Sequence, residues 1–429
     1  MSDWQKTTVG EVATGFLSGG TPTTSRADYW KGEIPWITSK WLGDKLELTN
    51  GEKFVSEEAV KKTSTKIVPK DSIIFATRVG VGKVGINRID LAINQDLAGV
   101  LIDNENYDIK FLAYQLGIDS IQQYVAMNKR GATIKGITRD CLEQIRLNVP
   151  PLPEQKKIAH ILSTVQRAIE AQERIIQTTT ELKKALMHKL FTEGLRKEPQ
   201  KQTEIGPVPE SWEVVELNQL ADLKNGYAFK STDYVAESNT LNIRMSNIRP
   251  GAQFDLEYNP RFLPDHFAET QKSFLLEDGD LIIAMTDMAN DPKILGVPTI
   301  VRNPSGKKLL LNQRVGKLVP TESRRVNLEF LRFYLSRKPA QRYLVSCAKK
   351  GVQVNIGKKD ILSVPIAFPK PDEQKTIVKC FNTLGDKVAA AENKVVALQD
   401  LFRTLLHELM TAKTRVHELT LPQEGTRHD

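Results

Sequence analysis

The sequence is poor in cysteine, and its cysteines stand far apart. Cys141, Cys347 and Cys380 are the three cysteines among 429 residues, and no C-x-x-C pair occurs. Structural zinc sites need paired thiolates or histidines at ligand spacing, and disulfide frameworks need a denser, even set. The six histidines form no cluster in the sequence. We therefore expect a reduced, cytosolic protein without a bound metal.

Long apolar runs are also absent. No stretch approaches the roughly 20 apolar residues of a membrane-spanning helix, and the N-terminus Met1–Trp4 lacks a signal-peptide pattern. Gly80–Gly85 fits G-x-G-x-x-G, but Ile86–Asp90 reads as strand or turn, whereas a dinucleotide site would open a helix there. We expect an intracellular protein with no membrane segment and no dinucleotide cofactor.

Positive charge exceeds negative charge. The chain has 60 Lys and Arg against 52 Asp and Glu, a net charge of +8 and a pI of about 9.1. Such a balance favours a polyanionic partner, although many basic proteins bind none. The charge alone is therefore only a hint of nucleic-acid binding.

The sequence contains a long internal repeat. Pro150–Ile158 reads PPLPEQKKI, and Pro369–Ile377 reads PKPDEQKTI, 219 residues later (377 − 158). Asn94-Gln95 likewise corresponds to Asn312-Gln313. A period of this length indicates a duplicated domain, because solenoid units are only a few tens of residues long. Two copies imply two similar sites.

Each copy reads as an α+β domain followed by one long helix. Short β-like runs such as Ser72–Ala76 are separated by Gly and Pro, and short helices are expected at Ile109–Leu116 and Leu328–Leu335. Prolines just before Glu154 and Glu373 are expected to block helix upstream, so that both long helices begin there.

The two long helices carry an apolar seam of heptad type, which is weaker in the first helix. About 40 residues at about 1.5 Å each make a helix of about 60 Å, and each large buried seam residue is worth about 1.5–3 kcal/mol. The seams therefore need a partner, most economically each other as an antiparallel pair, with burial in an ordinary helical bundle as the alternative. The seam positions are Ile158, Val165, Ile169, Gln172, Ile176, Thr179, Lys183, Leu186 and Leu190, and then Ile377, Leu384, Val388, Ala391, Val395, Leu398, Phe402, Leu405 and Leu409.

These residues resemble a known family. The segments Gly19-Gly20-Thr21-Pro22 and Ile34-Pro35-Trp36-Ile37, the two Pro-rich segments ending in Glu-Gln, and Ile205–Trp212 (IGPVPESW) resemble the specificity (S) subunit of type I restriction-modification systems over Trp4 to about Ala412. The second copy departs from the pattern, because Lys224–Phe229 (KNGYAF) replaces the Gly-Gly-Thr-Pro segment. The two domains are therefore expected to read different sequences.

The resemblance implies an α+β fold with two α/β target-recognition domains separated by two long antiparallel coiled-coil helices, related by a pseudo-two-fold repeat. The expected parts are a first target-recognition domain (1–153), a central spacer helix (154–195), a linker and second target-recognition domain (196–372), a distal spacer helix (373–413) and a C-terminal tail (414–429). The repeat is circular in character, so the tail is expected to return near the N-terminus.

The resemblance also implies a function. Each domain would read one half of a bipartite site in double-stranded DNA and so direct adenine methylation by two modification subunits, with restriction subunits as possible further partners. The chain itself would be non-catalytic and cytoplasmic in a prokaryote, and S-adenosylmethionine would bind the partner. Two inverted binding domains on a spacer lead to the same geometry. Insertions near Gln177–Thr180 should then change the tolerated gap and leave both half-sites unchanged.

Candidate DNA-contacting residues are polar and basic positions of types that bind phosphates or base edges. Just before each Pro-rich segment lies a basic doublet with a glycine, Lys129-Arg130-Gly131 and Lys349-Lys350-Gly351. A solvated charge cluster is the alternative interpretation. The candidates are Thr21, Thr23, Lys40, Arg78, Lys83, Lys129, Arg130, Thr133 and Lys135 in the first copy, and Lys224, Arg244, Asn247, Lys293, Arg314, Lys349, Lys350, Gln353 and Asn355 in the second.

Two other functions stay open from the residues alone. A stand-alone adenine methyltransferase needs a motif of the Asn/Asp-Pro-Pro-Tyr/Phe kind, and Asn259-Pro260-Arg261-Phe262 misses it by one residue. A coiled-coil protein scaffold without a DNA role would explain the seams but leave the duplicated domains and basic loops unexplained.

Overall fold

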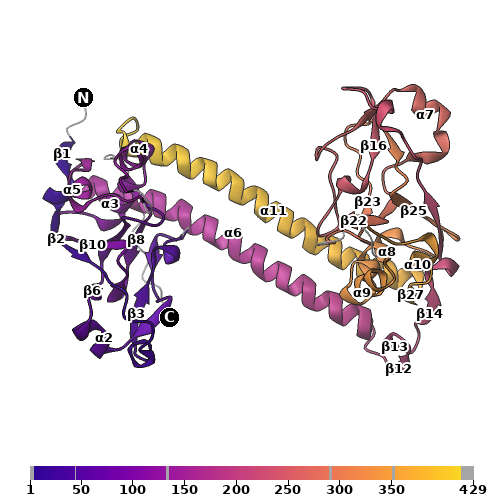
Figure 1. The fold of residues 1–429 in the computed structure, drawn as a ribbon, viewed down its shortest axis with the longest axis horizontal. Coiled ribbons are helices and arrows are strands. Elements are labelled where there is room, and N and C mark those ends of the chain that lie inside the picture. The colour runs from indigo at the N-terminus through magenta and orange to yellow at the C-terminus, as the bar shows by residue number, and fades with distance from the viewer. Residues whose placement is uncertain (1–3, 44, 132–134, 289–291, 350–352, 417–429) are drawn as a thin grey trace. The chain divides into compact units, whose positions relative to one another are not determined.

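The structure is a computed structural model that describes residues 4–43, 45–131, 135–288, 292–349 and 353–416. The chain divides into two compact units. Unit 1 comprises Met1–Arg174 and Glu392–Asp429, and unit 2 comprises Ile175–Ala391. Each long helix therefore contributes one part to each unit (Figure 1).

Unit 1 is built on two larger sheets. Their strand orders are β2-β10-β7-β8-β4 and β5-β3-β9-β6, and β1 pairs with β11 beside them. The strands are β1 Gln5–Thr8, β2 Ala13–Ser18, β3 Ile34–Ile37, β4 Glu47–Leu48, β5 Lys53–Val55, β6 Lys66–Val68, β7 Ser72–Ala76, β8 Val84–Asn87, β9 Leu91–Ile93, β10 Leu97–Ile102 and β11 Arg146–Val149. The helices are α1 Val9–Val12, α2 Glu57–Lys62, α3 Ile109–Leu116, α4 Asp119–Met127 and α5 Arg139–Glu143, with 3-10 turns η1 Ala27–Trp30 and η2 Ser39–Trp41.

Unit 2 repeats this framework. Its larger sheets have the orders β15-β25-β21-β23 and β19-β16-β24-β20, and β14 pairs with β27. Its strands are β12 Gln200–Thr203, β13 Gly206–Pro209, β14 Glu213–Glu216, β15 Ala221–Asn225, β16 Thr240–Ile243, β17 Ile248–Arg249, β18 Gln253–Phe254, β19 Phe262–Leu263, β20 Leu275–Leu276, β21 Leu281–Ala284, β22 Thr286–Met288, β23 Pro298–Ile300, β24 Lys308–Leu311, β25 Val315–Pro320, β26 Gln353–Asn355 and β27 Pro365–Phe368. Its short helices are α7 His266–Thr270, α8 Leu328–Leu335, α9 Lys338–Ser346 and α10 Lys358–Leu362, with 3-10 turns η3 Leu217–Gln219, η4 Ser231–Asp233, η5 Met245–Asn247 and η6 Lys272–Phe274.

The pairing of the second larger sheet is the same in both units. β3 and β9 run parallel in unit 1, as β16 and β24 do in unit 2, while the neighbours of each pair are antiparallel. β7 and β21 are buried along their whole length. The predicted α+β fold with an internal repeat is confirmed.

The short helices α3 and α8 have the bounds that the sequence predicts. Each begins after an N-cap residue, Asp108 or Asn327, whose side chain accepts a hydrogen bond from the backbone N–H three residues later. Phe111 and Phe330 are fully buried, as expected. Apolar periodicity is a local signal, which is why the sequence located these helices, and the caps explain where each one begins.

The long helices begin two residues earlier than predicted. α6 spans Leu152–Glu193 and α11 spans Pro371–Met410, so Pro153 and Pro371 lie inside the first turn. A proline is tolerated there because the first N–H groups of a helix have no partner within it. The prolines therefore mark the start of each helix and do not lie outside it.

Within each unit the two helical parts are antiparallel. In unit 1 the beginning of α6, with Ile158 and Leu162, shares one core with Leu409 and Met410 at the end of α11. In unit 2 the end of α6 packs against the first half of α11. Phe191 near the end of α6 stacks on Phe381 of α11 with ring centroids 5.9 Å apart.

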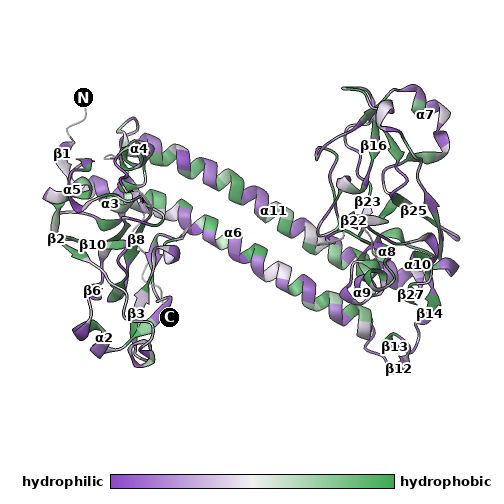
Figure 2. Ribbon diagram, in the orientation of Figure 1, coloured by the Kyte–Doolittle hydropathy of each residue, from purple (hydrophilic) through white to green (hydrophobic). Residues whose placement is uncertain are grey.

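Every predicted seam position is buried or half-buried. The hydropathy colours alternate along both helices, as the seam requires (Figure 2). One polar position stands out in unit 2. Lys183 lies with its ammonium 5.9 Å from the ring centroid of Phe333, and burial lowers its pKa, with a smaller contribution from the charge of Arg332.

The repeated Glu-Gln pairs join each long helix to its unit. Gln155 Oε1 accepts a hydrogen bond from Asp108 N at 2.9 Å, and its amide donates to Pro150 O at 2.8 Å. Gln374 makes the same pair of bonds with Asn327 N and Pro369 O at 2.9 and 2.8 Å. Buried backbone groups need such partners, so the motif has a structural role.

The glutamates accept bonds from the segments that follow the opposite helices. Buried Glu373 accepts from Leu195 N, just after α6, at 2.9 Å. Buried Glu154 accepts two bonds from Arg415, just after α11, at 2.8 and 3.0 Å. Val416 joins the unit 1 core that contains Trp4. The described start of the tail thus returns to the N-terminal unit, as predicted.

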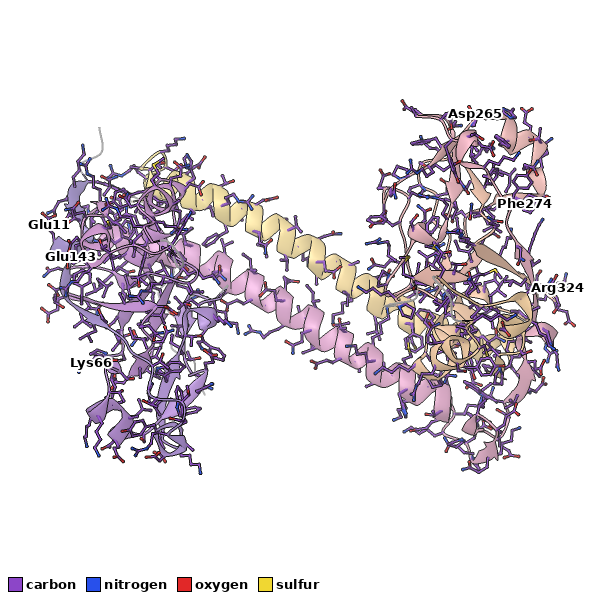
Figure 3. The ribbon with its side chains drawn as sticks, viewed as in Figure 1. Glu11, Lys66, Glu143, Asp265, Phe274 and Arg324 are labelled. Atoms are coloured by element: carbon purple, nitrogen blue, oxygen red, sulfur yellow. The ribbon has the colours of Figure 1, made fainter. Side chains whose placement is uncertain are left out.

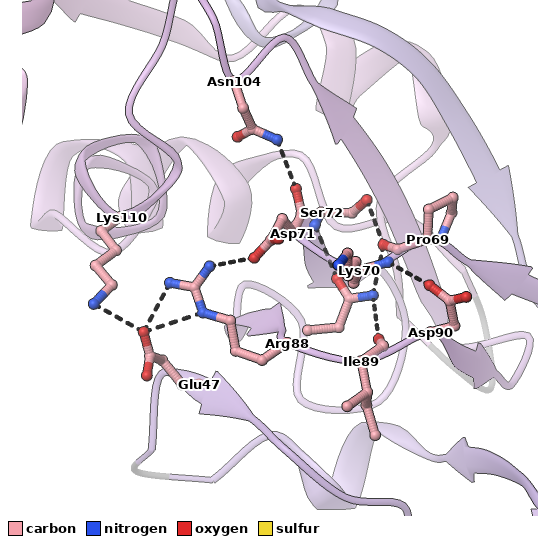
Figure 4. A network of polar contacts seen from close by, with 11 residues as sticks. Glu47, Pro69, Lys70, Asp71, Ser72, Arg88, Ile89, Asp90, Asn104 and Lys110 are labelled. Carbon is pink, nitrogen blue, oxygen red and sulfur yellow. Dashed lines mark hydrogen bonds and ion pairs between the residues drawn. The ribbon is translucent and has the colours of Figure 1, made fainter. Parts of the chain in front are cut away.

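A polar network crosses one side of unit 1 (Figure 4). Arg88 contacts Glu47 at 2.7 Å and Asp71 at 2.5 Å, and Lys110 contacts Glu47 at 2.9 Å. Burial alone raises the pKa of Glu47, but the hydrogen bonds and charges of Lys110 and Arg88 outweigh it and hold the pKa below its ordinary value. The network joins β4, the residue after β8, the residue before β7 and the start of α3.

The described residues were also compared with the requirements of a membrane-spanning helix and of a metal site. Among the described helices, none combines the length and hydropathy needed to cross a bilayer. In that same part of the chain, no group of three or more His, Cys, Asp or Glu side chains could hold a metal ion.

Candidate nucleic-acid interface

In unit 1, a polar hollow lies where loops from distant parts of the sequence meet. Its volume is about 570 Å³. Three arginines line it together with one glutamine and several small residues. The lining residues are Phe16, Ser18, Gly19, Thr77, Arg78, Gln95, Leu97, Ala98, Arg130, Gly136, Ile137, Thr138, Arg139 and Leu142.

The basic loop is held at the hollow by backbone bonds. Arg130 and Gly136 exchange two N–H to O bonds of 2.7 and 2.9 Å in an antiparallel bridge, and Ile137 N donates to Thr77 O at 2.9 Å. These bonds place Arg130 and Arg78 on one hollow although 52 residues separate them in sequence (130 − 78). Lys129 precedes Arg130, Lys135 precedes Gly136, and both lysines are exposed, while predicted Thr133 lies outside the described residues.

The glycine-rich loop reaches the same hollow. Thr21 Oγ1 donates to Gln95 Oε1 at 2.5 Å. A Cβ on Gly19 would lie 2.1 Å from Ile93 O and 2.4 Å from Asn94 O, so only glycine allows this approach. Thr23 is exposed further along the loop, and Lys40 is exposed on η2.

Unit 2 builds the same frame from equivalent backbone bonds. In unit 2, Met285 N donates to Arg314 O and Ile356 N donates to Met285 O, both at 3.0 Å. The equivalent bonds in unit 1 run from Thr77 N to Asp96 O and from Ile137 N to Thr77 O. Lys349 and Asn355 form the equivalent antiparallel bridge. Gly226 occupies the place of Gly19, since its Cβ would lie 2.4 Å from Leu311 O.

The side chains on the two frames differ. The position of Arg78 in unit 1 is occupied by Thr286 in unit 2, and the Thr286 hydroxyl donates to Asn355 Oδ1 at 2.7 Å. Asn355 itself occupies the position of Gly136. Gln353 lies on β26 beside Met288 of β22. Arg314 and Lys349 are exposed, Lys293 is exposed on a neighbouring loop, and predicted Lys350 lies outside the described residues.

Asn247, Lys224 and Lys83 are among the predicted residues that bond to neighbouring segments of their own unit. Asn247 is 3% exposed, and its amide accepts from Arg244 N and donates to Asp255 O, both at 2.9 Å. Lys224 donates to Ser273 O and lies 5.4 Å from the ring of Phe274, which Figure 3 labels. Lys83 donates to Leu42 O at 2.8 Å, although it is exposed. The side chain of Asn247 stabilises a turn through these two bonds, so its role is structural.

Arg244 is half-buried in the outer part of unit 2. Its Nη2 donates to Asn259 O at 2.9 Å, and Nε is buried without a hydrogen-bond partner among the described residues. Burial lowers its pKa, with a further contribution from the charge of Arg261. Arg244 therefore remains a candidate, whereas neighbouring Asn247 does not.

Gln95 and Arg139 line the unit 1 hollow with long polar side chains but are not among the predicted candidates. Gln95 belongs to the repeated Asn-Gln pair, so its recurrence was a signal, but nothing in the sequence placed it beside Arg78. Arg139 lines the hollow from α5, where it also lies 4.8 Å from the ring of Phe16 and pairs with Glu143 at 2.6 Å.

Comparison with known proteins gives a consistent result. Residues 1–180 and 209–398 match the family described as type I restriction modification DNA specificity domain. The MjaVIII specificity subunit of Methanocaldococcus jannaschii is 24% identical over 97% of this chain and 94% of its own length. The EcoR124I/EcoR124II specificity subunit of Escherichia coli is 32% identical over 37% of this chain and 40% of its own length.

A solved structure has the same fold. The type I restriction-modification S subunit from M. genitalium aligns with a TM-score of 0.59 at 16% identity, covering 95% of this chain and 96% of that one. The family match covers most of the chain in two copies, in agreement with the two units. The chain therefore belongs to the type I restriction-modification DNA specificity family.

Proposed function

We propose that this chain is the DNA-recognition subunit of a type I restriction-modification complex in which each unit reads one half of a bipartite site. The supporting observation is that one backbone frame occurs twice with different side chains on it. A repeated frame gives two readers the same approach to the duplex, and different side chains give them different base preferences.

The unit 1 hollow suits DNA in its chemistry. Arg78 and Arg130 are exposed at its rim, and an arginine can contact both acceptors of a guanine or neutralise a phosphate. In unit 2, Asn355 is of a type that pairs with adenine edges, and Arg314 and Lys349 supply positive charge. We expect the half-site of unit 1 to contain the greater share of guanine.

The chain is proposed to act without catalysing methyl transfer or cleavage. Two modification subunits would bind S-adenosylmethionine and methylate adenine, with restriction subunits as optional partners, in a prokaryotic cytoplasm. Isolated chain mixed with S-adenosylmethionine and DNA should transfer no methyl groups. Transfer at any measurable rate would instead favour the stand-alone methyltransferase.

Arg130→Ala in the assembled complex tests the reading of one half-site. Arg146→Ala is the matched control, because Arg146 is an exposed arginine of the same unit on β11 and outside the hollow. Methylated adenines mapped on a random-sequence library should show relaxed specificity in one half-site for Arg130→Ala and an unchanged motif for the control.

Salt dependence separates base reading from phosphate contact. If Arg130 binds a phosphate, its loss should reduce the slope of log affinity against log salt by about one and leave the motif unchanged. If neither slope nor motif changes, Arg130 has no role in DNA binding. Affinity of the wild-type complex that does not fall with salt would favour the protein-scaffold function.

A further inference from the structure

Three glutamines recur at equivalent places in the two units, and the fold explains two of these pairs. Gln155 and Gln374 make equivalent hydrogen bonds to backbone groups. Gln122 donates to Gly82 O and Leu116 O, and Gln341 donates to the equivalent Gly296 O and Leu335 O, at 2.8 to 2.9 Å. Both pairs hold backbone in place.

The third pair, Gln95 and Gln313, is exposed and is not explained in this way. Gln95 receives one hydrogen bond, from Thr21, but Ala228 stands at the equivalent place in unit 2 and cannot supply it. Among the described residues the side-chain amide of Gln313 has no hydrogen-bond partner, whereas its backbone N–H donates to Tyr227 O at 3.0 Å. The identity of these two side chains therefore does not serve folding.

The framework nevertheless presents both glutamines on equivalent turns. Buried Asn94 and Asn312 precede them, and each accepts a bond from the backbone N–H two residues on, at 3.2 and 3.1 Å. Asn94 N donates to Ile37 O as Asn312 N donates to Ile243 O, at 3.0 and 2.9 Å. Two equal turns thus expose one glutamine each beside the close-packed glycine of its unit.

Around these glutamines the side chains diverge. Arg78 and Gly136 of the unit 1 frame correspond to Thr286 and Asn355 of the unit 2 frame. If divergent residues read what differs between the half-sites, a shared exposed residue reads what the half-sites have in common. A glutamine amide suits adenine, because it accepts from the N6 amino group and donates to N7 in the major groove.

We propose that Gln95 and Gln313 each contact an adenine that both half-sites contain. This inference rests on the proposed function, since it requires each unit to read one half-site. Gln95 and Gln313 would read the one base that the two half-sites share. The side chains that differ between the units would read the other bases.

The test uses the full complex with its modification subunits and a random-sequence DNA library. Gln95→Ala should lose discrimination at one adenine of the unit 1 half-site by roughly five- to hundredfold, and Gln313→Ala should do so at one adenine of the other half-site. Gln95→Glu keeps the acceptor and removes the donor to N7, so it should lose the same adenine. Gln123→Ala, an exposed glutamine of α4 that Arg342 replaces in unit 2, should leave the motif unchanged.

The outcomes separate this inference from the function beneath it. If the wild-type complex methylates no bipartite site, the proposed function itself is wrong. If the wild type has a bipartite motif and both alanine variants keep it, the glutamines do not read bases and the inference is overturned. A uniform loss of affinity with an unchanged motif also overturns it, because it identifies a phosphate contact.

Discussion

Replacing Gln374 with alanine should loosen unit 2 at a defined place. Its Oε1 accepts from Asn327 N at 2.9 Å, and its amide donates to Pro369 O at 2.8 Å and to Arg325 O at 3.1 Å. The side chain is fully buried, so water does not replace these bonds freely. With about 1 kcal/mol for each lost bond, and more where a buried group stays unpaired, we expect the free energy of unfolding to fall by about 2–4 kcal/mol.

The position of the damage can be measured as well as its size. Asn327 is the N-cap of α8, and its amide hydrogen should exchange much faster in Gln374→Ala because its acceptor is gone. Denaturant unfolding gives the total loss, and hydrogen exchange followed by mass spectrometry locates it. Gln399→Ala, an exposed glutamine of α11, is the matched control and should change neither.

Gln155 offers an internal repetition of the experiment. Gln155→Ala should deprotect Asp108 and leave Asn327 protected, because Asp108 N is the equivalent donor in unit 1. The reasoning would be refuted if Gln374→Ala cost less than about 0.5 kcal/mol while Asn327 kept its protection. Deprotection spread evenly over both units would show that the bond has no local role.

Further predictions concern the helices and the ion pairs. Leu398→Pro should disrupt α11 at a local cost of about 3 kcal/mol or more, and size-exclusion chromatography should show no complex with the modification subunit, whereas normal assembly would contradict it. Lys183→Met should stabilise unit 2 by about 1 kcal/mol by adding apolar burial. Burial lowers the pKa of Lys183 in the folded state, so the stability of the wild type should rise as pH increases from that lowered pKa to the ordinary pKa of lysine. Denaturant unfolding of Lys183→Met at the same pH values should show no such rise. Glu47→Gln should cost about 1 kcal/mol near neutral pH, a modest value because the carboxylate is 41% exposed. Because the pKa of Glu47 is lowered in the folded state, the stability difference between wild type and Glu47→Gln should be fully present above the ordinary pKa of 4.5. The difference should vanish as pH falls through the pKa of the folded state. A stability difference that does not depend on pH would refute the role of the Glu47 charge.

The sequence alone determined the features that depend on neighbouring residues or on repetition. The 219-residue repeat, the bounds of α3 and α8, and the seam along α6 and α11 follow from apolar periodicity and recurring motifs. The starts of the long helices were misplaced by two residues, because a proline signals the first turn of a helix as readily as the residue before it.

The tertiary structure decided which polar residues act together. The bond from Ile137 N to Thr77 O places Arg130 beside Arg78, and the turn after β9 adds Gln95, although all three lie on separate segments. Burial likewise distinguished Asn247, which holds a turn, from exposed candidates of the same residue type. Such pairings depend on strand order and register, which join distant segments through backbone groups that every residue carries, so no local pattern of side chains specifies them.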